Sequence, residues 1–403
     1  MTALADRPTD SEPHRSGWAV LAAGAAALAV AMGIGRFVYT PILPLMHDQA
    51  GLSQSGGATL ATANYLGYLI GALIPIVRPA LLKSGWLLRG SLLAVIGTLA
   101  LMPVTQSQPI WFGLRLIAGV ASALVFVIAV SALLDHLHGA AQHLVGWAFG
   151  GIGAGIALSG LLVLVLRTVG SWRTGWWASA ALAALLTVLA WRLAPEPASA
   201  KAGPGRMSER PTTHRWFVTL LTGYTLEGVG YIIAGTFLVA AIGQTSPGWL
   251  GSGAWVLVGL AAVPASAFWA ALSRRWSRPT LLIVMLFVQA VGIALPALSG
   301  GAAAALVSAV LFGATFLGVA SLVLAVGAHL RFPHAVALLT TGYSVGQIAG
   351  PLLVSPLLHN GYRLPLLIAA AIVAAATVAA AALRVRFPHR VGPMVEPSRQ
   401  ARS

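Results

Sequence analysis

Long apolar runs separated by short polar gaps make up most of the chain. Twelve of these runs are close to the roughly 20 residues that a helix needs to cross about 30 Å of hydrocarbon. We therefore predict an all-α integral membrane protein with twelve transmembrane helices. The runs cover residues 17–43, 54–77, 84–104, 109–134, 141–166, 172–194, 215–241, 249–272, 279–298, 302–327, 334–357 and 363–383.

One long polar segment interrupts this pattern between the sixth and seventh runs. It is rich in Pro, Ala and Ser, a composition typical of a flexible linker. The predicted organisation has five parts. They are a cytoplasmic tail 1–16, a six-helix bundle 17–194, a cytoplasmic linker 195–213, a second six-helix bundle 214–385 and a cytoplasmic tail 386–403.

The two predicted bundles resemble each other in sequence. "GIGRFVYTPIL" from residue 33 aligns with "GVGYIIAGTFL" from residue 228, and "GVAS" occurs at 119 and again at 318. Gly151 and Gly155 of the fifth run correspond to Gly346 and Gly350 of the eleventh. Three matches in the same order at nearly the same offset predict two pseudo-symmetric halves, with a substrate site near mid-membrane between them.

Charge is scarce and unevenly distributed along the chain. The sequence is 58% hydrophobic and 8% charged, with a mean hydropathy of +0.85. The formal net charge of +15 does not indicate a nucleic-acid partner, because Lys and Arg lie in the gaps between apolar runs. Cytoplasmic loops hold an excess of these residues. If the N-terminus lies inside, the outer loops contain only Arg167, Arg173 and Arg363.

This distribution predicts a multi-pass protein of the bacterial inner membrane with both termini in the cytoplasm. We expect it to work as a monomer in the lipid bilayer. The chain has no cysteine, so disulfides and thiolate metal sites are excluded.

Two arginines lie within predicted spans, where a charge costs at least about 2.5 to 3.5 kcal/mol. Arg36 lies roughly 12 Å from the outer end of the first span, deep enough to favour a wet cavity over snorkelling to the headgroups. Tyr39, three residues on, shares its helical face. For Arg115 in the fourth span, burial alone leaves a structural and a functional role open, since Gly119 one turn later also suits close helix packing.

Glu227 is the acidic residue nearest the membrane midplane, roughly 18 Å beyond Arg215 along the seventh span. The ionised form of a poorly hydrated carboxyl group is disfavoured, so a glutamate whose hydration alternates can load and release protons. The other interpretation is a buried structural glutamate. Gly223, Gly230 and Tyr231 lie on the same helical face and would leave room and supply a hydroxyl.

The remaining candidates carry weaker signals. Gln289 and Gln347 could bind a substrate or a neighbouring helix, and the sequence does not decide between them. The polar stretch "DHLHGAAQH" after the fourth span matches no zinc spacing, so we expect no metal site and no cofactor.

Several short segments of the chain resemble sequences of the major facilitator superfamily, in particular of its YbfB/YjiJ-like branch. They are "GIGRFVYTPILPLM" (33–46), "EGVGYIIAGTFLVA" (227–240), "FWAAL" (268–272), "GATFLG" (313–318) and "GQIAGP" (346–351). The resemblance implies that the first and seventh helices line a central cavity, so that Arg36 and Glu227 face each other's half. It also implies a proton-coupling role for Arg115, in an R-x-x-x-G pattern, and helix-packing roles for Gly151 and Gly155. In the superfamily, the loop between the second and third helices normally contains an aspartate. The corresponding loop of this chain has none.

The sequence thus predicts a secondary active transporter of a small organic molecule that works by alternating access. Proton coupling would use Glu227 as the carrier, with Arg36 and Arg115 as cavity charges, and protonation would break a pairing of Glu227 with either arginine. A membrane sensor or an intramembrane enzyme is the alternative. An enzyme is disfavoured because no span holds a central histidine and Glu227 has no acidic partner at its depth. Drug efflux and organic-anion transport both stay open.

Overall fold

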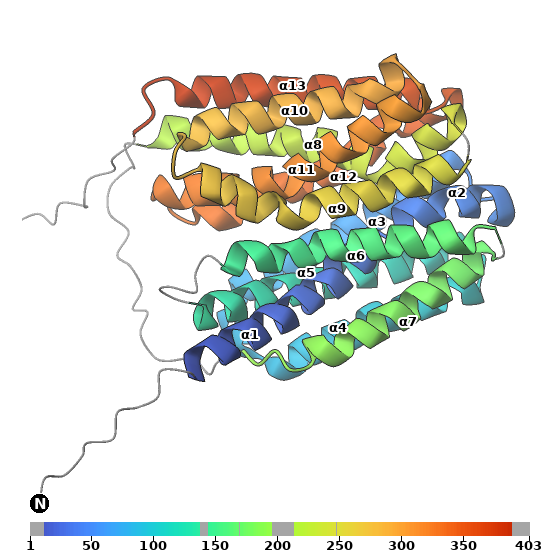
Figure 1. Ribbon diagram of the computed structural model, residues 1–403, viewed down its shortest axis with the longest axis horizontal. Helices are drawn as coiled ribbons and strands as arrows, with labels where there is room; N and C mark the ends of the chain where they lie inside the picture. The colour runs from blue at the N-terminus through green and yellow to red at the C-terminus, as the bar shows by residue number, and fades with distance from the viewer. Residues whose placement is uncertain (1–11, 138–143, 169, 196–212, 247, 389–403) are drawn as a thin grey trace, which may run out of the picture.

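The computed structural model describes residues 12–137, 144–168, 170–195, 213–246 and 248–388, and these residues form helices and connecting turns without any strand (Figure 1). The helix axes are roughly aligned with one another (Figure 1). Helices suit a membrane span because each satisfies its backbone polar groups within its own segment.

The helices of the first half follow the predicted apolar runs. They are α1 Glu12–Leu28, a π-helix Ala29–Ile34, α2 Tyr39–Ala50, α3 Gln54–Val77, α4 Gly85–Leu101, α5 Gln108–His136, α6 Leu144–Leu166 and α7 Trp172–Ala190. Short 3₁₀ turns, Pro79–Lys83 and Met102–Val104, follow α3 and α4.

The second half contributes six long helices. They are α8 His214–Thr245, α9 Gly248–Leu272, α10 Arg278–Leu298, α11 Gly301–His329, α12 Ala335–Val354 and α13 Arg363–Arg384, with a 3₁₀ turn Ser355–Asn360 after α12. In the first half, α1 begins at Glu12 and α7 ends at Ala190, and in the second half α8 begins at His214 and α13 ends at Arg384. Most of the predicted linker, residues 196–212, lies outside the described residues.

Eleven helical segments among the described residues are long and apolar enough to cross a membrane, against the twelve predicted. The sixth predicted span, α7, does not reach that hydropathy, because its first six residues, "WRTGWW", include Arg173 and other residues of low hydropathy. It nevertheless packs against α4 within the same group of helices (Figure 1).

The chain folds into two groups of helices that meet along a seam. Helices α1–α7 lie on one side and α8–α13 on the other, with α6 and α9 adjacent in the middle (Figure 1). We use "seam" for the contacts of α6 with α9, α3 with α12 and α2 with α8. Glycines allow the first of these contacts, since a Cβ on Gly153 would lie 2.7 Å from the carbonyl oxygen of Gly259.

Glycines also bring α6 against the first span within the first half. Gly151 faces the backbone of Ala25 in α1, and a Cβ on Gly155 would lie 2.6 Å from the carbonyl oxygen of Ala29. No side chain larger than hydrogen fits at such distances, so these glycines set how closely the two helices approach.

The matching glycines of the second half make the corresponding contact. Gly346 of α12 faces the backbone of Thr225 in α8, and a Cβ on Gly350 would lie 2.7 Å from the carbonyl oxygen of Val229. The fifth predicted span thus packs on the first as the eleventh packs on the seventh, which agrees with the repeat in the sequence.

Candidate functional site

The first span is interrupted where Arg36 lies. The π-helix ends at Ile34, residues 35–38 form a turn, and α2 begins at Tyr39. Glycine at 35 favours this break, and Pro41 has no N–H to donate to the preceding turn. The Thr40 N–H donates to the carbonyl oxygen of Phe37 at 3.2 Å instead of to that of Arg36, its partner in a regular helix. The carbonyl of Arg36 therefore needs another donor.

Arg115 supplies that donor from α5. Its Nη1 donates to the carbonyl oxygen of Gly35 and its Nη2 to that of Arg36, both at 3.2 Å. Its guanidinium carbon lies 4.8 Å from the centre of the Tyr39 ring, and the side chain is 2% exposed. The planar fork of arginine suits two adjacent carbonyl oxygens. Arg115 therefore acts as a brace on the broken first span.

The glycine of the R-x-x-x-G pattern helps to hold this brace. Gly119 faces the backbone of Asn64 in α3, so that α3 and α5 pack with their backbones close together. The Asn64 side chain donates to the carbonyl oxygen of Arg115 at 3.0 Å.

Arg36 lies at the seam and does not extend toward the headgroups. Its Nη2 donates to Oε1 of Gln347 in α12 at 2.7 Å, and it is 3% exposed. Its guanidinium carbon lies 4.4 Å from the centre of the Tyr68 ring and 4.9 Å from that of Tyr65, both in α3. These distances suit cation–π attraction. The Nε of Arg36 has no partner among the described residues.

Neither buried arginine has an acidic partner among the described residues. The single salt bridge found in that part of the chain joins Lys83 to Asp135 at 2.6 Å, on the first half. The predicted pairing of Glu227 with Arg36 or Arg115 is therefore wrong for this conformation. Asp135 comes from the "DHLHGAAQH" stretch, whose residues 138–143 lie outside the described chain, and no cluster of three or more metal-ligand residues occurs in the described ranges.

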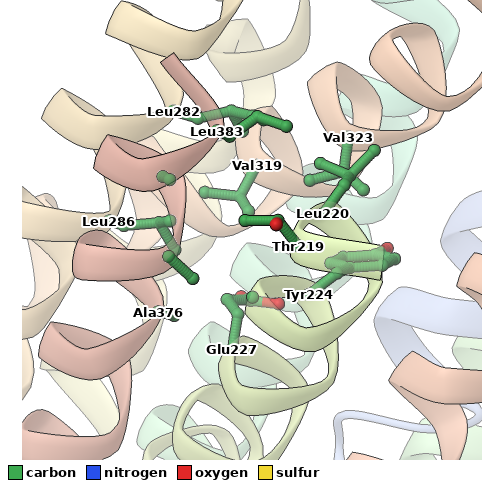
Figure 2. Close-up of a pocket in the computed structure, with 13 residues that line it drawn as sticks. Thr219, Leu220, Tyr224, Glu227, Leu282, Leu286, Val319, Val323, Ala376 and Leu383 are labelled. Carbon is green, nitrogen blue, oxygen red and sulfur yellow. The ribbon is translucent and has the colours of Figure 1, made fainter. Parts of the chain in front are cut away.

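Glu227 faces the interior of the second half. Its Oε1 accepts a hydrogen bond from Nε2 of Gln289 in α10 at 3.3 Å, while its Oε2 has no partner among the described residues. The carboxyl group is 1% exposed and borders a pocket between α8, α10, α11 and α13 (Figure 2). Leucine, valine and alanine make up most of its wall, and its free volume of about 10 Å³ suits a single water molecule.

This orientation contradicts the expectation that Glu227 faces the first half. Gly223 and Gly230 lie on the same helical face and pack toward Ala379 and Val373 of α13, so their small size serves helix packing. Gly228, one residue after Glu227, instead faces Tyr343 of α12 near the seam.

The two candidate tyrosines occupy different surroundings. Tyr39 is buried in the first half, where its hydroxyl donates to the carbonyl oxygen of Gly57 at 2.8 Å. Tyr231 lies in a group of stacked rings with Tyr343 and Phe316 in the second half. Tyr39 thus holds the first half together, whereas Tyr231 lies near the seam.

Two hydrogen bonds across the seam were not predicted from the sequence. The Thr40 hydroxyl donates to the carbonyl oxygen of Gly235 at 2.6 Å, and the hydroxyls of Tyr65 and Thr236 lie 2.8 Å apart. Thr40 and Gly235 are 195 residues apart, which is the offset of the repeat. Equivalent residues that touch must lie beside the axis that relates the two halves. The repeat identifies Thr40 and Gly235 as equivalent residues, but only the structure shows that this pair lies at the axis.

A vestibule with both polar and apolar residues in its wall opens between the halves. It has a volume of about 440 Å³ and lies where α2 and α8 end, with His47, Asp48, Arg167 and Gln244 in its wall. The Tyr362 hydroxyl and Nε2 of His47 lie 3.5 Å apart across it. The seam is therefore closed at the depth of Arg36 and hollow at one end.

Comparison with known proteins agrees with this arrangement. Residues 28–383 match the model of a family described as "Uncharacterised MFS-type transporter YbfB". The chain belongs to this family. It is a multi-pass membrane transporter of the major facilitator superfamily, and its family and fold are those of a transporter rather than an enzyme.

Individual relatives support the family and the fold. Over 177 residues the chain is 26% identical to the uncharacterised transporter YgaY of Escherichia coli (strain K12) and 25% identical to YgaY of Escherichia coli O157:H7. Each match covers 44% of this chain and 44% of the relative, so the chain spans less than half of the length of these relatives. A crystal structure of a mutant of the nucleoside transporter NupG superposes with a TM-score of 0.72 at 14% identity, covering 91% of this chain and 100% of that one. At this identity the likeness concerns the fold alone.

Proposed function

We propose that the protein is a proton-coupled secondary active transporter of a small organic anion. It works by alternating access between bundles 17–194 and 214–385. Arg36 binds the anion and Glu227 carries the proton. The observation that carries this proposal is the position of Arg36, a buried guanidinium at the seam with no acidic partner among the described residues.

A buried charge without a counter-ion is costly, and a substrate anion would lower that cost when it binds. In the present conformation the amide oxygen of Gln347 accepts one hydrogen bond from Arg36, while Nε of the guanidinium is unused. A carboxylate accepts hydrogen bonds from a guanidinium more strongly than an amide does, and it can do so in a bidentate manner. An arriving anion therefore displaces Gln347 and releases a contact between α12 and the first span.

Proton coupling follows from the position of Glu227. Its unpartnered Oε2 borders a small pocket with a mostly apolar wall. A carboxyl group whose access to water changes as the helices move will gain and lose a proton with that movement. Because Glu227 bonds to Gln289 and forms no ion pair with Arg36 in this conformation, the coupling runs through movement of α8 and its neighbours and not through an ion pair.

The remaining features of the proposal concern topology. The transporter lies in the bacterial inner membrane as a monomer with both termini in the cytoplasm, as the distribution of Lys and Arg favours. The vestibule at the ends of α2 and α8 then faces outward.

Binding of a matched pair of probes tests the anion site. Benzoate and benzamide have the same ring and differ in charge, so purified protein in lipid nanodiscs should bind benzoate more tightly by isothermal titration calorimetry. Arg36→Gln should abolish the preference, whereas Arg173→Gln, an exposed arginine, should retain it. If Arg36→Gln bound benzoate as tightly as the unmodified protein, the proposed anion site would be wrong.

A further inference from the structure

Aromatic rings surround the guanidinium that we assign to the anion. Tyr65 and Tyr68 present their ring faces to Arg36, and Phe37 follows it in the chain with its ring centre 5.4 Å from the guanidinium carbon. All three aromatic side chains are buried. Three buried aromatic rings therefore have their centres within 5.4 Å of the guanidinium carbon of Arg36.

These rings continue into the second half as a stack. Tyr224 and Tyr343 have ring centres 4.3 Å apart, Tyr343 and Tyr231 5.8 Å, and Tyr231 and Phe316 5.7 Å. Their interplanar angles are 14°, 21° and 14°, so the rings are nearly parallel. The stack lies beside Arg36, because Tyr343 precedes Gln347 by one helical turn on α12.

The stack meets the first half through one edge-on contact. Phe37 and Phe316 have ring centres 6.3 Å apart at an interplanar angle of 74°, and Phe37 also meets Trp255 of α9 at 6.4 Å. Both contacts cross the seam, so they are lost when the halves separate. When the two halves separate, the guanidinium of Arg36 becomes exposed. The faces and edges of the neighbouring rings then lose their partners.

We propose that the transported anion carries a planar aromatic ring close to its acidic group, as in an aryl carboxylate or an aryl sulfonate. This inference rests on the proposed function, because it assigns the anionic group to Arg36. The ring of the substrate inserts between Phe37 and the parallel stack and restores the edge and face contacts that separation removes. Tyr231 and Phe316 are then the residues that select the ring.

The contrasting interpretation is that the rings only fill the seam. Hydrophobic burial alone favours a saturated ring at least as much as an aromatic one, since a saturated ring carries more apolar hydrogen-bearing surface. Preference for the aromatic partner of a matched pair therefore separates recognition by stacking from simple burial.

The test uses three matched pairs of anions with the intact protein in lipid nanodiscs. They are benzoate with cyclohexanecarboxylate, phenylacetate with cyclohexylacetate, and benzenesulfonate with cyclohexanesulfonate. Isothermal titration calorimetry should give roughly 2- to 10-fold tighter binding of the aromatic member in each pair. Phe316→Leu should reduce this ratio to about 1 while keeping the dependence on Arg36. Phe268→Leu, on a ring that is 57% exposed, should leave the ratio unchanged.

The outcomes distinguish the inference from the function on which it rests. Equal or tighter Arg36-dependent binding of the saturated members would overturn the aromatic inference and leave the anion site standing. If no pair bound in a manner that depends on Arg36, the proposed anion transport would fail. Should Phe316→Leu unfold, Tyr231→Leu supplies the same comparison, and a ratio that neither variant changes would also overturn the inference.

Discussion

Arg115 donates a hydrogen bond from Nη2 to the backbone carbonyl oxygen of Arg36 at 3.2 Å. The side chain of Arg36 in turn donates to Gln347 at 2.7 Å across the seam. Arg115 thus holds the backbone of Arg36, and the side chain of Arg36 extends toward the second half. In the function that we propose, the two cations have different tasks, because Arg115 fixes the broken helix and Arg36 binds the anion.

Replacing Arg115 should therefore reduce stability. Arg115→Gln removes the donors of two buried carbonyl groups, each of which costs about 1 to 3 kcal/mol when left unsatisfied. Thermal unfolding in detergent should show a clear fall in Tm, with a smaller fall for Arg115→Lys, whose compact ammonium cannot match the planar fork. Arg173→Gln serves as the control, since Arg173 is exposed.

The opposite pattern would restore the role implied by resemblance to the superfamily. If Arg115→Gln kept its Tm and its anion binding but lost proton coupling, Arg115 would take part in coupling and the brace would be unimportant.

A carboxylate at position 347 should weaken anion binding at Arg36. Gln347→Glu keeps the size of the side chain and places a negative charge beside Arg36, which supplies the missing counter-ion. We expect benzoate binding to weaken at least about tenfold, because the guanidinium is then paired and a second anion is repelled. Gln347→Leu separates charge from the loss of the amide, since it leaves Arg36 unpaired and should retain binding. Unchanged benzoate binding by Gln347→Glu would mean that the anion binds elsewhere.

The packing glycines should respond differently from glycines in open surroundings. Gly151→Ala would press a methyl group against the backbone of Ala25, and overpacking of this kind costs about 1 to 3 kcal/mol. Gly113→Ala in α5 meets nothing within 4 Å and should be neutral or stabilising by up to about 1 kcal/mol. Thermal unfolding of the two variants side by side would measure this difference, and equal Tm values would contradict the close contact of α6 with α1.

The fold could be predicted because membrane spans can be recognised in a sequence by the length and hydropathy of their apolar runs. The exception, α7, has too low a hydropathy because its first six residues contain Arg173 and three tryptophans. The depth of Arg36 predicted a wet cavity, which stays a prediction, since in this structure Arg36 is buried against Gln347. Its partners Tyr65 and Tyr68 could not be predicted, because they lie on α3 in no recognisable motif.

The orientation of Glu227 shows a different limit of sequence reasoning. Depth along a helix can be counted from the sequence, but rotation about the helix axis depends on which face packs against which neighbour. Gly223 and Gly230 fitted a roomy cavity as well as they fitted a close helix contact, and α13 supplies the contact. The carboxyl group consequently lies against Gln289 rather than across the seam from Arg36.

The most direct test of the account follows protons in proteoliposomes that contain a pH-sensitive dye. Benzenesulfonate suits this assay because it stays ionised at every assay pH and does not cross the bilayer as a neutral acid. In the unmodified protein, an imposed benzenesulfonate gradient should drive proton movement. Glu227→Gln keeps the hydrogen bond from Gln289 but cannot ionise, so it should exchange labelled benzenesulfonate across the membrane without moving protons. Proton movement in Glu227→Gln equal to that of the unmodified protein would contradict the assignment of Glu227 as the proton carrier.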